Sequence, residues 1–398
     1  MAKASSSGMR GPVGDEARFD VAVVTTAALP WRTGPAYLSL WHACGLAEMG
    51  LRTAYVVPWV GIAGQNRLWG RPDFATPAVH AEWLAGEAAR LGCPPLPDVF
   101  HYRAHGSALL RSIVPLQDVF AAVPPTDVVV LAEPEHLCWY PFTRPRRRVA
   151  AKTVAGLIMT NYEHYLHGQF PPALRGLAPL VTRIHRSLVR RHTDWVVPLS
   201  PAVADVAAGH PTRQARVTGV LVPYARVPPV RPRSGGAYFI GRLVWDKGLE
   251  TVIDVARRLD LPIDVLGDGP DAAAIRGLAR DRAAPVRFLG ASPAPWEQLP
   301  DYRVFLNPSV SEVLCTATAD ALVAGRHVVM ADCPANQPFR PYPNAHFFTD
   351  IEGAVATMRR AMAEQPDPPD AVRRDFDWRN ACRTLASLWA DSGESGPR

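Results

Sequence analysis

Two basic residues in one short segment could bind a phosphorylated ligand. Arg242 and Lys247 follow a strand predicted at residues 238–240 and precede a predicted helix that begins at Gly248. In an open parallel sheet this edge forms the ligand crevice, and a helix start adds free N–H groups and a positive dipole end. The two cations would stabilise a diphosphate that gains negative charge as it departs. Two solvated cations at a helix start would give the same pattern.

Two carboxylates further along the chain add a second signal. A strand predicted at residues 304–306 ends near Asn307, a loop carries Glu312, and a helix starting near Thr316 carries Asp320 about one turn in. Paired acceptors at this spacing suit a ligand with several hydroxyls, such as a sugar and a ribose, while the helix N-terminus meets phosphates. Asp320 alone could be a first-turn acid favoured by the helix dipole. Glu312 has no such explanation.

The elements that must position these residues form two similar series. In the first half the expected strands are 21–25, 53–57, 128–131, 157–159 and 195–198, with helices at 37–49 and 81–91. In the second half they are 238–240, 263–266, 286–289, 304–306 and 328–330, with helices at 248–259, 272–280 and 316–324. This alternation predicts an α/β fold with two doubly wound, Rossmann-like sheets.

The length of 398 residues favours two domains, because single hydrophobic cores rarely grow past about 250 residues. The segment 222–236 is rich in proline and arginine without periodicity, so it predicts an exposed linker. The expected divisions are a flexible tail at 1–18, an N-terminal domain at 19–221, that linker, a C-terminal domain at 237–365, and a breaker with a terminal helix at 366–398.

Composition excludes some classes and leaves others open. With 48% hydrophobic and 20% charged residues, the chain is neither disordered nor fibrous. Its start lacks the apolar core of a signal peptide, and no apolar window is long enough to span a bilayer, so membrane contact would be peripheral. Six separated cysteines without a metal-binding pattern predict reduced thiols in the cytoplasm. A net charge of +6 admits a nucleic acid, an anionic membrane or a phosphorylated substrate.

Several motifs together resemble the retaining GT-B glycosyltransferases. The G-R-x4-K-G segment is joined by a G-x-G-P loop at residues 267–270, a V-x-F-L-G strand at 286–290, and the acidic pair Glu312 and Asp320. Within that group the chain is most similar to the digalactosyldiacylglycerol synthases, through residues 238–248, 307–309 and 314–319. The first half agrees at residues 25–34, 57–59, 133–137, 139–140 and 160–162, so the resemblance covers about 19–389.

The resemblance implies roles for single residues. Arg242 and Lys247 would hold the donor diphosphate, Glu312 the hydroxyls of the transferred sugar, and Asp320 the ribose. Further donor contacts are expected at Gly34, Gly241, Gly267, Gly269, Phe288, Leu314, Cys315 and Thr316. The acceptor or reaction centre is expected at Trp31, Arg32, Thr33, Glu133, His136, Met159 and Asn161. The implied donor is UDP-galactose and the implied acceptor a monoglycosyl diacylglycerol, with no metal and no other cofactor.

Two positions depart from the family pattern. Asp320 stands where the family usually has Glu, and Met159 where relatives usually carry a histidine that lines the reaction centre. These departures keep a non-catalytic nucleotide-sugar-binding protein as an alternative. His136 could equally serve as a structural hydrogen-bonding group, and Glu133 could belong to a satisfied turn. Asp377, in the only Asp-x-Asp, is expected to cap a helix rather than bind a metal.

A basic stretch could contact a membrane. It contains Arg144, Arg146, Arg147, Arg148, Lys152, Arg175, Arg183, Arg186, Arg190 and Arg191. Leu177, Leu180, Val181, Ile184 and Leu188 recur there at helical spacing, so the arginines are expected on the opposite face of an amphipathic helix. This face suits an anionic membrane. A buried helix with solvated arginines is the alternative, and the lack of a nucleic-acid motif or stacking aromatic array argues against a nucleic-acid partner.

Overall fold

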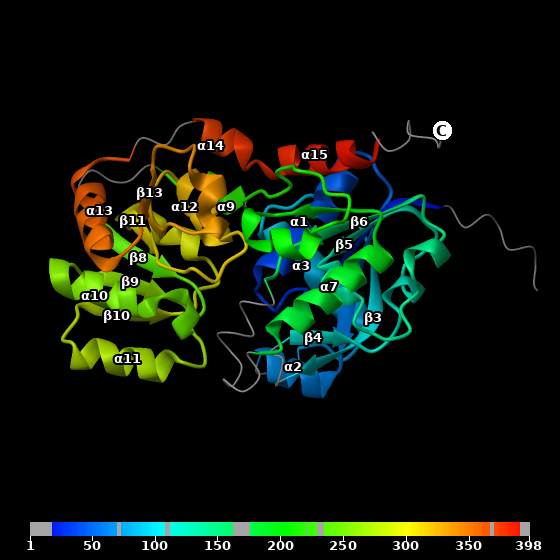
Figure 1. Cartoon of the computed structure of the whole chain (residues 1–398), viewed down its shortest axis with the longest axis horizontal. Helices are drawn as coiled ribbons and strands as arrows, with labels where there is room; N and C mark the ends of the chain where they lie inside the picture. The colour runs from blue at the N-terminus through cyan, green and yellow to red at the C-terminus, as the bar shows by residue number, and fades with distance from the viewer. Residues whose placement is uncertain are drawn as a thin grey trace, which may run out of the picture.

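The computed structural model describes residues 18–69, 73–107, 112–161, 176–220, 222–228, 235–366 and 370–390. These residues form two lobes side by side, each with a mainly parallel sheet between layers of helices (Figure 1). The predicted α/β fold with two Rossmann-like halves is confirmed. The predicted tail lies almost wholly outside the described residues.

The N-terminal lobe contains seven strands among its described residues, in the order β4-β3-β2-β1-β5-β6-β7. They are β1 (Phe19–Thr25), β2 (Thr53–Val60), β3 (Asp98–Ser107), β4 (Ser112–Pro115), β5 (Thr126–Ala132), β6 (Thr153–Ile158) and β7 (Trp195–Pro198). All neighbours are parallel except β3 and β4. In β1, Val21 and Val23 enter one core while Ala22 and Val24 enter another, because helices cover both faces. Because both faces of the sheet are covered, the residues of β1 from Val21 to Val24 are all apolar.

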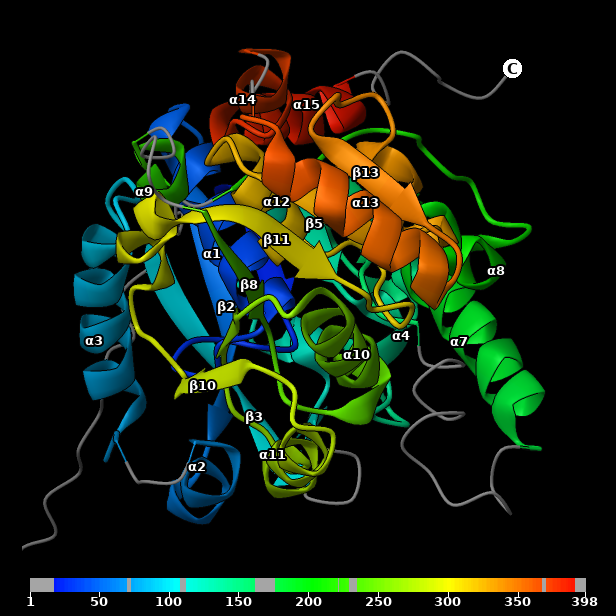
Figure 2. The same cartoon turned by 90° about the vertical axis from the view of Figure 1, so that its left-hand side faces the viewer.

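Helices surround this sheet. They are α1 (Gly34–Glu48), α2 (Ile62–Trp69), α3 (Pro77–Arg90), α4 (Pro134–Leu137), α7 (Ala178–His192) and α8 (Ala204–Ala207). Short 3-10 turns lie at η1 (Val119–Ala121), η2 (Arg146–Arg148) and η3 (Pro201–Val203). Figure 2 shows α3 and α7 on opposite flanks of the molecule.

The C-terminal lobe contains a parallel sheet of six described strands in the order β10-β9-β8-β11-β12-β13. They are β8 (Gly236–Ile240), β9 (Ile263–Leu266), β10 (Val286–Gly290), β11 (Tyr302–Asn307), β12 (His327–Ala331) and β13 (Ala345–Phe348). Its helices are α10 (Leu249–Leu259), α11 (Ala272–Asp281), α12 (Thr316–Val323) and α13 (Ile351–Ala363). Turns η4 (Trp245–Lys247), η5 (Pro295–Glu297), η6 (Leu299–Asp301) and η7 (Pro334–Phe339) connect them.

The end of the chain returns to the N-terminal lobe. Helices α14 (Asp370–Asp375) and α15 (Trp378–Ala390) run along the top of Figure 1 from one lobe to the other. The Trp378 ring lies 4.9 Å from that of Trp41 on α1. A Cβ at Gly45 would come within 2.4 Å of Cys382 Sγ, so a glycine lets the two helices approach closely. Asp377 Oδ1 accepts from the backbone N–H of Arg379 at 2.8 Å, which caps the start of α15.

The predicted linker at 222–236 is wrong in part. Residues 222–225 form the short helix α9 (Val222–Ala225), and Tyr224 and Val227 are buried in a C-terminal core cluster. Tyr224 packs edge-on against Trp296 with ring centroids 5.6 Å apart. Tyr224 and Val227 therefore attach this proline-rich segment to the C-terminal domain.

Candidate functional site

Loops at the carboxyl ends of β8 and β9 pack tightly together. Leu243 N–H donates to the Asp268 carbonyl at 3.0 Å, and Gly241 N–H donates to the Leu266 carbonyl at 3.0 Å. A Cβ at Gly267 would lie 1.9 Å from the Gly241 oxygen, and its φ of +145° also favours glycine. A Cβ at Gly269 would lie 2.4 Å from the Leu243 oxygen. These glycines therefore fix the shape of the segment that carries Arg242.

Lys247 and Glu312 meet at the same edge. Lys247 ends turn η4, Glu312 lies in the loop after β11, and their side chains form an ion pair in which each is about one-fifth exposed. Ser311 Oγ donates to the Asp246 carbonyl at 3.0 Å and joins the two loops. Arg242 is exposed on the same segment. A cation and a carboxylate are thus held together, half-buried, where a charged and hydroxylated ligand could bind both.

Helix α12 begins beside this pair without a side-chain cap. Its N-cap is Cys315, and Thr316 in the first turn is exposed. Asn307 Nδ2 donates to Thr318 Oγ1 at 2.9 Å, which ties the strand end to the helix start. Burial raises the pKa of the Cys315 thiol to about 12, so it is not a nucleophile at neutral pH. Leu314 is half-buried against the core. The open helix start can receive an anion.

The N-terminal lobe closes on this helix start. A Cβ at Gly34 would lie 3.7 Å from the Thr316 methyl group, so the N-terminus of α1 faces that of α12. Thr33 Oγ1 accepts from Ala36 N–H at 3.4 Å and caps α1. Asp320, on α12, lies near enough to raise the pKa of Tyr37, although burial is the larger cause. Residues from both lobes therefore line one site.

Glu133 occupies the carboxyl edge of the N-terminal sheet. It follows β5 with φ 68° and ψ 63°, a left-handed conformation that costs a residue with a side chain about 1–3 kcal/mol. Glu133 is 5% exposed, and its carboxylate accepts hydrogen bonds from the hydroxyls of Thr26, after β1, and Thr160, after β6. Burial raises the pKa of Glu133, while the two hydroxyls act in the opposite direction. Three adjacent strand ends are thereby joined.

The other residues predicted for the reaction centre are more dispersed. His136 is fully buried, and its Nε2 bonds the Ile113 carbonyl at 2.6 Å. Burial lowers the pKa of His136 to about 4, so it is neutral at pH 7. Met159 is 8% exposed within a core cluster, and Trp31 packs against the same cluster while Arg32 is exposed. Asn161 Nδ2 donates to the Ala202 carbonyl at 2.8 Å.

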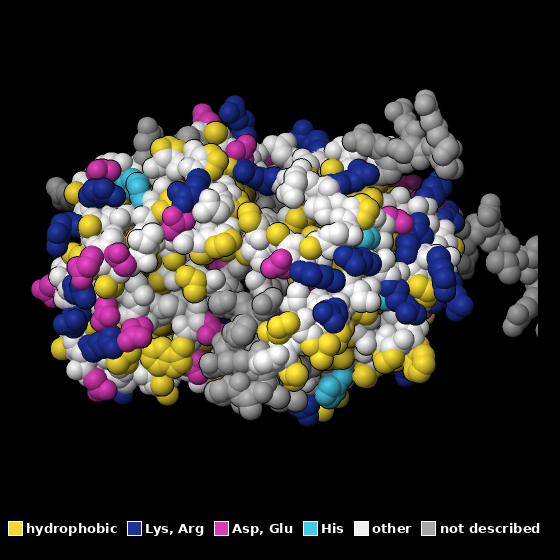
Figure 3. All heavy atoms as spheres, in the orientation of Figure 1, with side chains coloured by type: hydrophobic (Ala, Val, Ile, Leu, Met, Phe, Trp, Pro, Cys, Tyr) yellow, Lys and Arg dark blue, Asp and Glu magenta, His cyan; other side chains and the backbone are white. Residues whose placement is uncertain are grey.

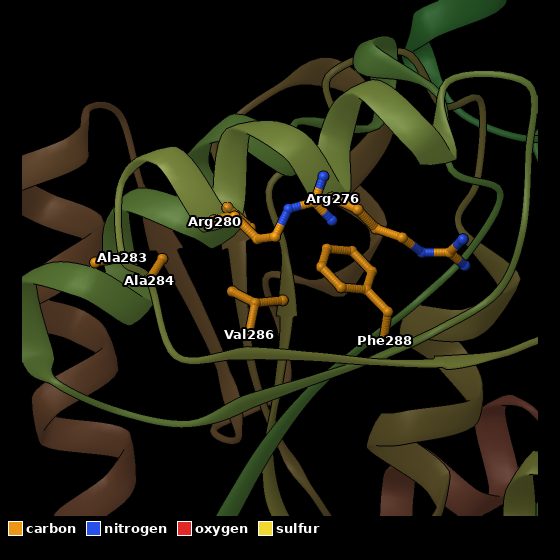
Figure 4. A pocket seen from close by; sticks show the side chains of 7 residues that line it. Arg276, Arg280, Ala283, Ala284, Val286 and Phe288 are labelled. Carbon is orange, nitrogen blue, oxygen red and sulfur yellow. The ribbon is translucent and has the colours of Figure 1, made fainter.

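Phe288 lies on β10, the strand whose last residue, Gly290, accepts a hydrogen bond from Gly267 N–H at 2.8 Å. It points from β10 toward α11, under the guanidinium of Arg276 at 5.6 Å from the ring centroid. With Arg276, Arg280 and Val286 it lines a cavity of about 190 Å³ (Figure 4). The expected contact with the donor base involves the backbone of residues 286–290 and stays a prediction.

Helix α7 corrects the expected division of its faces. Its buried residues are Ala178, Thr182, His185, Val189 and His192. Leu180 and Ile184 are 52% and 47% exposed, on the side that also carries Arg183. The inner contact uses polar rings instead, since Trp139 Nε1 donates to His185 Nε2 at 3.3 Å. Apolar and basic side chains thus share the exposed side, contrary to the predicted opposite faces.

Figure 3 shows Lys and Arg side chains gathered over the lobe that carries α7. Arg183, Arg186, Arg190 and Arg191 line a hollow of about 510 Å³ together with Ser187. Arg186 Nη2 lies 3.5 Å from Asp205 Oδ1, and Arg190 Nη2 donates to the Ala208 carbonyl at 2.8 Å. Of the basic stretch, Arg175 lies outside the described residues.

Sequence reasoning missed Thr26 and Tyr37 as site residues, and Thr160 was noted only as part of a motif. Each becomes relevant through a partner distant in sequence: the two threonines donate hydrogen bonds to Glu133, and the charge of Asp320 adds to burial in raising the pKa of Tyr37. Strand ends at residues 25–26 and 158–160 were a usable signal, because neighbouring parallel strands bring their carboxyl ends together.

Two features are absent from the residues that the structure describes. No cluster of three or more His, Cys, Asp or Glu side chains in these ranges could hold a metal ion. No described helix combines the length and apolar character needed to cross a bilayer.

Comparison with solved structures identifies the two-lobed fold. Sucrose-phosphate synthase from Thermosynechococcus elongatus superposes with a TM-score of 0.65 at 14% identity, covering 95% of this chain and 100% of that one. Anabaena HepE in complex with UDP and glucose gives 0.60 at 12% identity, covering 94% and 100%. Residues 236–363 match the family described as glycosyl transferases group 1. The chain is a glycosyltransferase with the GT-B fold.

Sequence relatives narrow the class. The chain is 31% identical over 383 residues to digalactosyldiacylglycerol synthase 2, chloroplastic, of Glycine max, covering 91% of this chain and 81% of the relative. It is 33% identical over 379 residues to digalactosyldiacylglycerol synthase 1, chloroplastic, of Arabidopsis thaliana, covering 90% of this chain and 46% of that relative. It therefore spans about half the length of the second protein. The chain belongs to the digalactosyldiacylglycerol synthase family, as its motifs predict.

Proposed function

We propose that this chain transfers galactose from UDP-galactose, with retention of anomeric configuration, to a hydroxyl of a monoglycosyl diacylglycerol. The observation that carries the proposal is the Lys247–Glu312 pair, which lies beside the uncapped start of α12 and opposite Gly34. The names of the relatives supply the sugar and the lipid. No cofactor or metal is part of this proposal.

The C-terminal lobe binds the donor. Lys247 and Arg242 neutralise the diphosphate, and the N–H groups at the start of α12 add the positive end of a helix dipole. Glu312 accepts hydrogen bonds from hydroxyls of the hexose, and Asp320 accepts from the ribose. When phosphate binds, Lys247 exchanges part of its contact with Glu312 for a phosphate oxygen, which frees a carboxylate oxygen for the sugar.

The N-terminal lobe binds the acceptor near Trp31, Arg32 and Met159. In retaining transfer the departing phosphate can accept the proton of the attacking hydroxyl, so a histidine at position 159 is not required as a base. Met159, which is 8% exposed, adds apolar packing beneath this part of the cleft in place of a histidine ring. Activity is therefore expected despite the departure from the family pattern.

The exposed side of α7 contacts an anionic membrane in this proposal. Leu180 and Ile184 insert among lipid headgroups, while Arg183 and Arg191 neutralise them, each nearby cation contributing about 1 kcal/mol. Leu177, Leu180 and Ile184 are all about half exposed. Adjacent exposed apolar side chains favour an interaction surface over a helix that faces only water. The protein then works as a peripheral membrane enzyme.

Incubation of the purified chain with a panel of nucleotide sugars and glycerolipids tests the proposal. Mass spectrometry of the lipids should show one added hexose with UDP-galactose and a monogalactosyl lipid, and NMR should show the donor's α configuration kept. Transfer from another nucleotide sugar would change the proposed donor. An inverted linkage would contradict the proposed retention of configuration. Nucleotide binding without transfer to any acceptor would favour the non-catalytic alternative.

A further inference from the structure

The carboxylate of Glu133 determines the polarity of two threonine hydroxyls. Thr26 Oγ1 and Thr160 Oγ1 both donate to it. A hydroxyl has one hydrogen, so each oxygen has only accepting capacity left for another partner. Thr26 is 3% exposed, whereas Thr160 is only partly buried. Thr160 is therefore the member of the trio that can meet a ligand.

The backbone around this trio is fixed on every side. Glu133 N–H donates to the Leu157 carbonyl at 2.9 Å, and its own carbonyl accepts from His136 N–H at 2.9 Å. Its left-handed conformation persists because these bonds and the two hydroxyls hold it. Beyond Thr160, Asn161 is tied to the Ala202 carbonyl at 2.8 Å. The position of the Thr160 oxygen is thus set by contacts on both sides.

The trio lies at the carboxyl edge of the sheet that faces the donor lobe. β1, β5 and β6 are neighbours, and Thr26, Glu133 and Thr160 each follow one of them within two residues. Eight residues after Thr26, Gly34 meets the start of α12. Met159, predicted for the reaction centre, immediately precedes Thr160.

We propose that Thr160 Oγ1 accepts a hydrogen bond from a hydroxyl of the acceptor sugar that neighbours the one receiving the transferred hexose, and that Glu133 is the positioning residue that keeps Thr160 Oγ1 an acceptor. This inference rests on the proposed function and adds a binding residue to it. This hydrogen bond holds the acceptor sugar so that its attacking hydroxyl faces the donor sugar and keeps its own hydrogen for the departing phosphate. No proton is transferred to Thr160, since the departing phosphate takes it.

Steady-state kinetics of three variants test this inference. Thr160→Val keeps the shape but removes the hydroxyl, and should lower kcat/KM for the lipid acceptor about 10- to 100-fold while the Kd for UDP stays within about twofold. Thr160→Ser should restore most of the loss. Glu133→Gln donates from its amide to one threonine and should also lower kcat/KM. The double variant Thr160→Val with Glu133→Gln should have a kcat/KM close to that of Thr160→Val alone, because both substitutions disrupt the same interaction.

Thr53→Val is the matched control, because Thr53 donates to the Leu51 carbonyl at 3.0 Å at the opposite edge of the sheet. It should leave acceptor kinetics unchanged. A merely structural role for Thr160 would lower the thermal midpoint of Thr160→Val without changing acceptor KM or kcat, and would overturn the inference. If the wild type transfers no hexose, the proposed function fails and this inference fails with it. If the wild type transfers and Thr160→Val equals it, only this inference fails.

Discussion

The two halves of the cleft differ in the exposure of their polar side chains. In the C-terminal half, Lys247 and Glu312 are partly exposed on loops whose shape is set by glycines. In the N-terminal half, Glu133 and His136 are buried and bonded to other protein groups. The first half keeps charge available for a charged ligand. The second half uses buried groups to hold its neighbours in place, so its effect on a ligand is indirect.

This difference predicts that acid weakens the N-terminal half first. Burial lowers the pKa values of His42, His101, His136 and His185, in that half, to about 4, and that of His327 in the other half likewise. A folded-state pKa below the unfolded value of about 6.5 gives stability that is full above pH 6.5 and is lost as pH falls toward 4. The loss should reach several kcal/mol.

Hydrogen exchange followed by mass spectrometry at pH 7 and pH 5, corrected for the intrinsic rate, measures this loss by region. Peptides of the N-terminal half should lose protection before those of the C-terminal half. His42→Gln, which can still donate to the Val217 carbonyl, should reduce the pH dependence. Burial raises the pKa values of Glu133 and Glu135, so these carboxyls oppose the effect of the histidines. The stability that they contribute is present at low pH and is lost as pH rises. Equal loss of protection in both halves would contradict the predicted difference between them.

The next largest effect is expected at the donor half. Lys247→Ala should weaken UDP binding by about 1.5–3 kcal/mol, because a charge-assisted bond to phosphate is lost, while the fold remains intact. Isothermal titration calorimetry measures the change. Arg258→Ala removes an exposed ion pair to Glu352 in the same lobe and is the matched control. Unchanged affinity in Lys247→Ala would remove Lys247 from the diphosphate site.

Glycine packing at the donor half gives a sharper test of shape. Gly269→Ala places a Cβ 2.4 Å from the Leu243 oxygen, so the loop must move at a cost of about 1–3 kcal/mol. UDP affinity and the free energy of unfolding should both fall. Gly86→Ala, on helix α3, meets nothing within 4 Å and should be neutral or slightly stabilising in denaturant unfolding. A Gly269→Ala protein with wild-type UDP affinity would show that this loop does not shape the site.

The C-terminal half of the cleft was more predictable from sequence than the N-terminal half for a physical reason. Gly241, Lys247 and Glu312 lie in short local motifs, where glycine spacing and a helix start already define the chemistry. All predicted elements from β8 to β12 are present in the structure. Strands β3, β4 and β13 were not predicted. β3 carries Arg and His residues between its apolar ones, which hides its periodicity.

The acceptor half could not be predicted in the same way. The role of Thr160 depends on Glu133, 27 residues earlier, and that of Thr26 on the same carboxylate, 107 residues later. Only the order of strands in the folded sheet brings the three together. Helix α7 was misread for a related reason, since its inner side uses His185 and Thr182 where hydropathy favours leucines.

The smallest effect is expected at the membrane surface. Arg183→Gln with Arg191→Gln should weaken sedimentation with acidic vesicles by about 1 kcal/mol for each charge, and binding should fall as salt rises. Arg257→Gln with Arg359→Gln, on helices of the other lobe, is the matched control. If vesicle binding depends neither on salt nor on the α7 substitutions, α7 is not the membrane-binding surface and its exposed leucines have another role.

The most direct test of the central claim compares wild type and Glu312→Gln in one assay with UDP-galactose and monogalactosyldiacylglycerol. The wild type should yield a lipid one hexose heavier, and Glu312→Gln should lose about 10- to 100-fold in turnover while its UDP affinity changes less than about threefold. This result would assign Glu312 to the sugar and the cleft to hexose transfer. Equal turnover in the two proteins, or no product from the wild type with any lipid acceptor, would contradict the account.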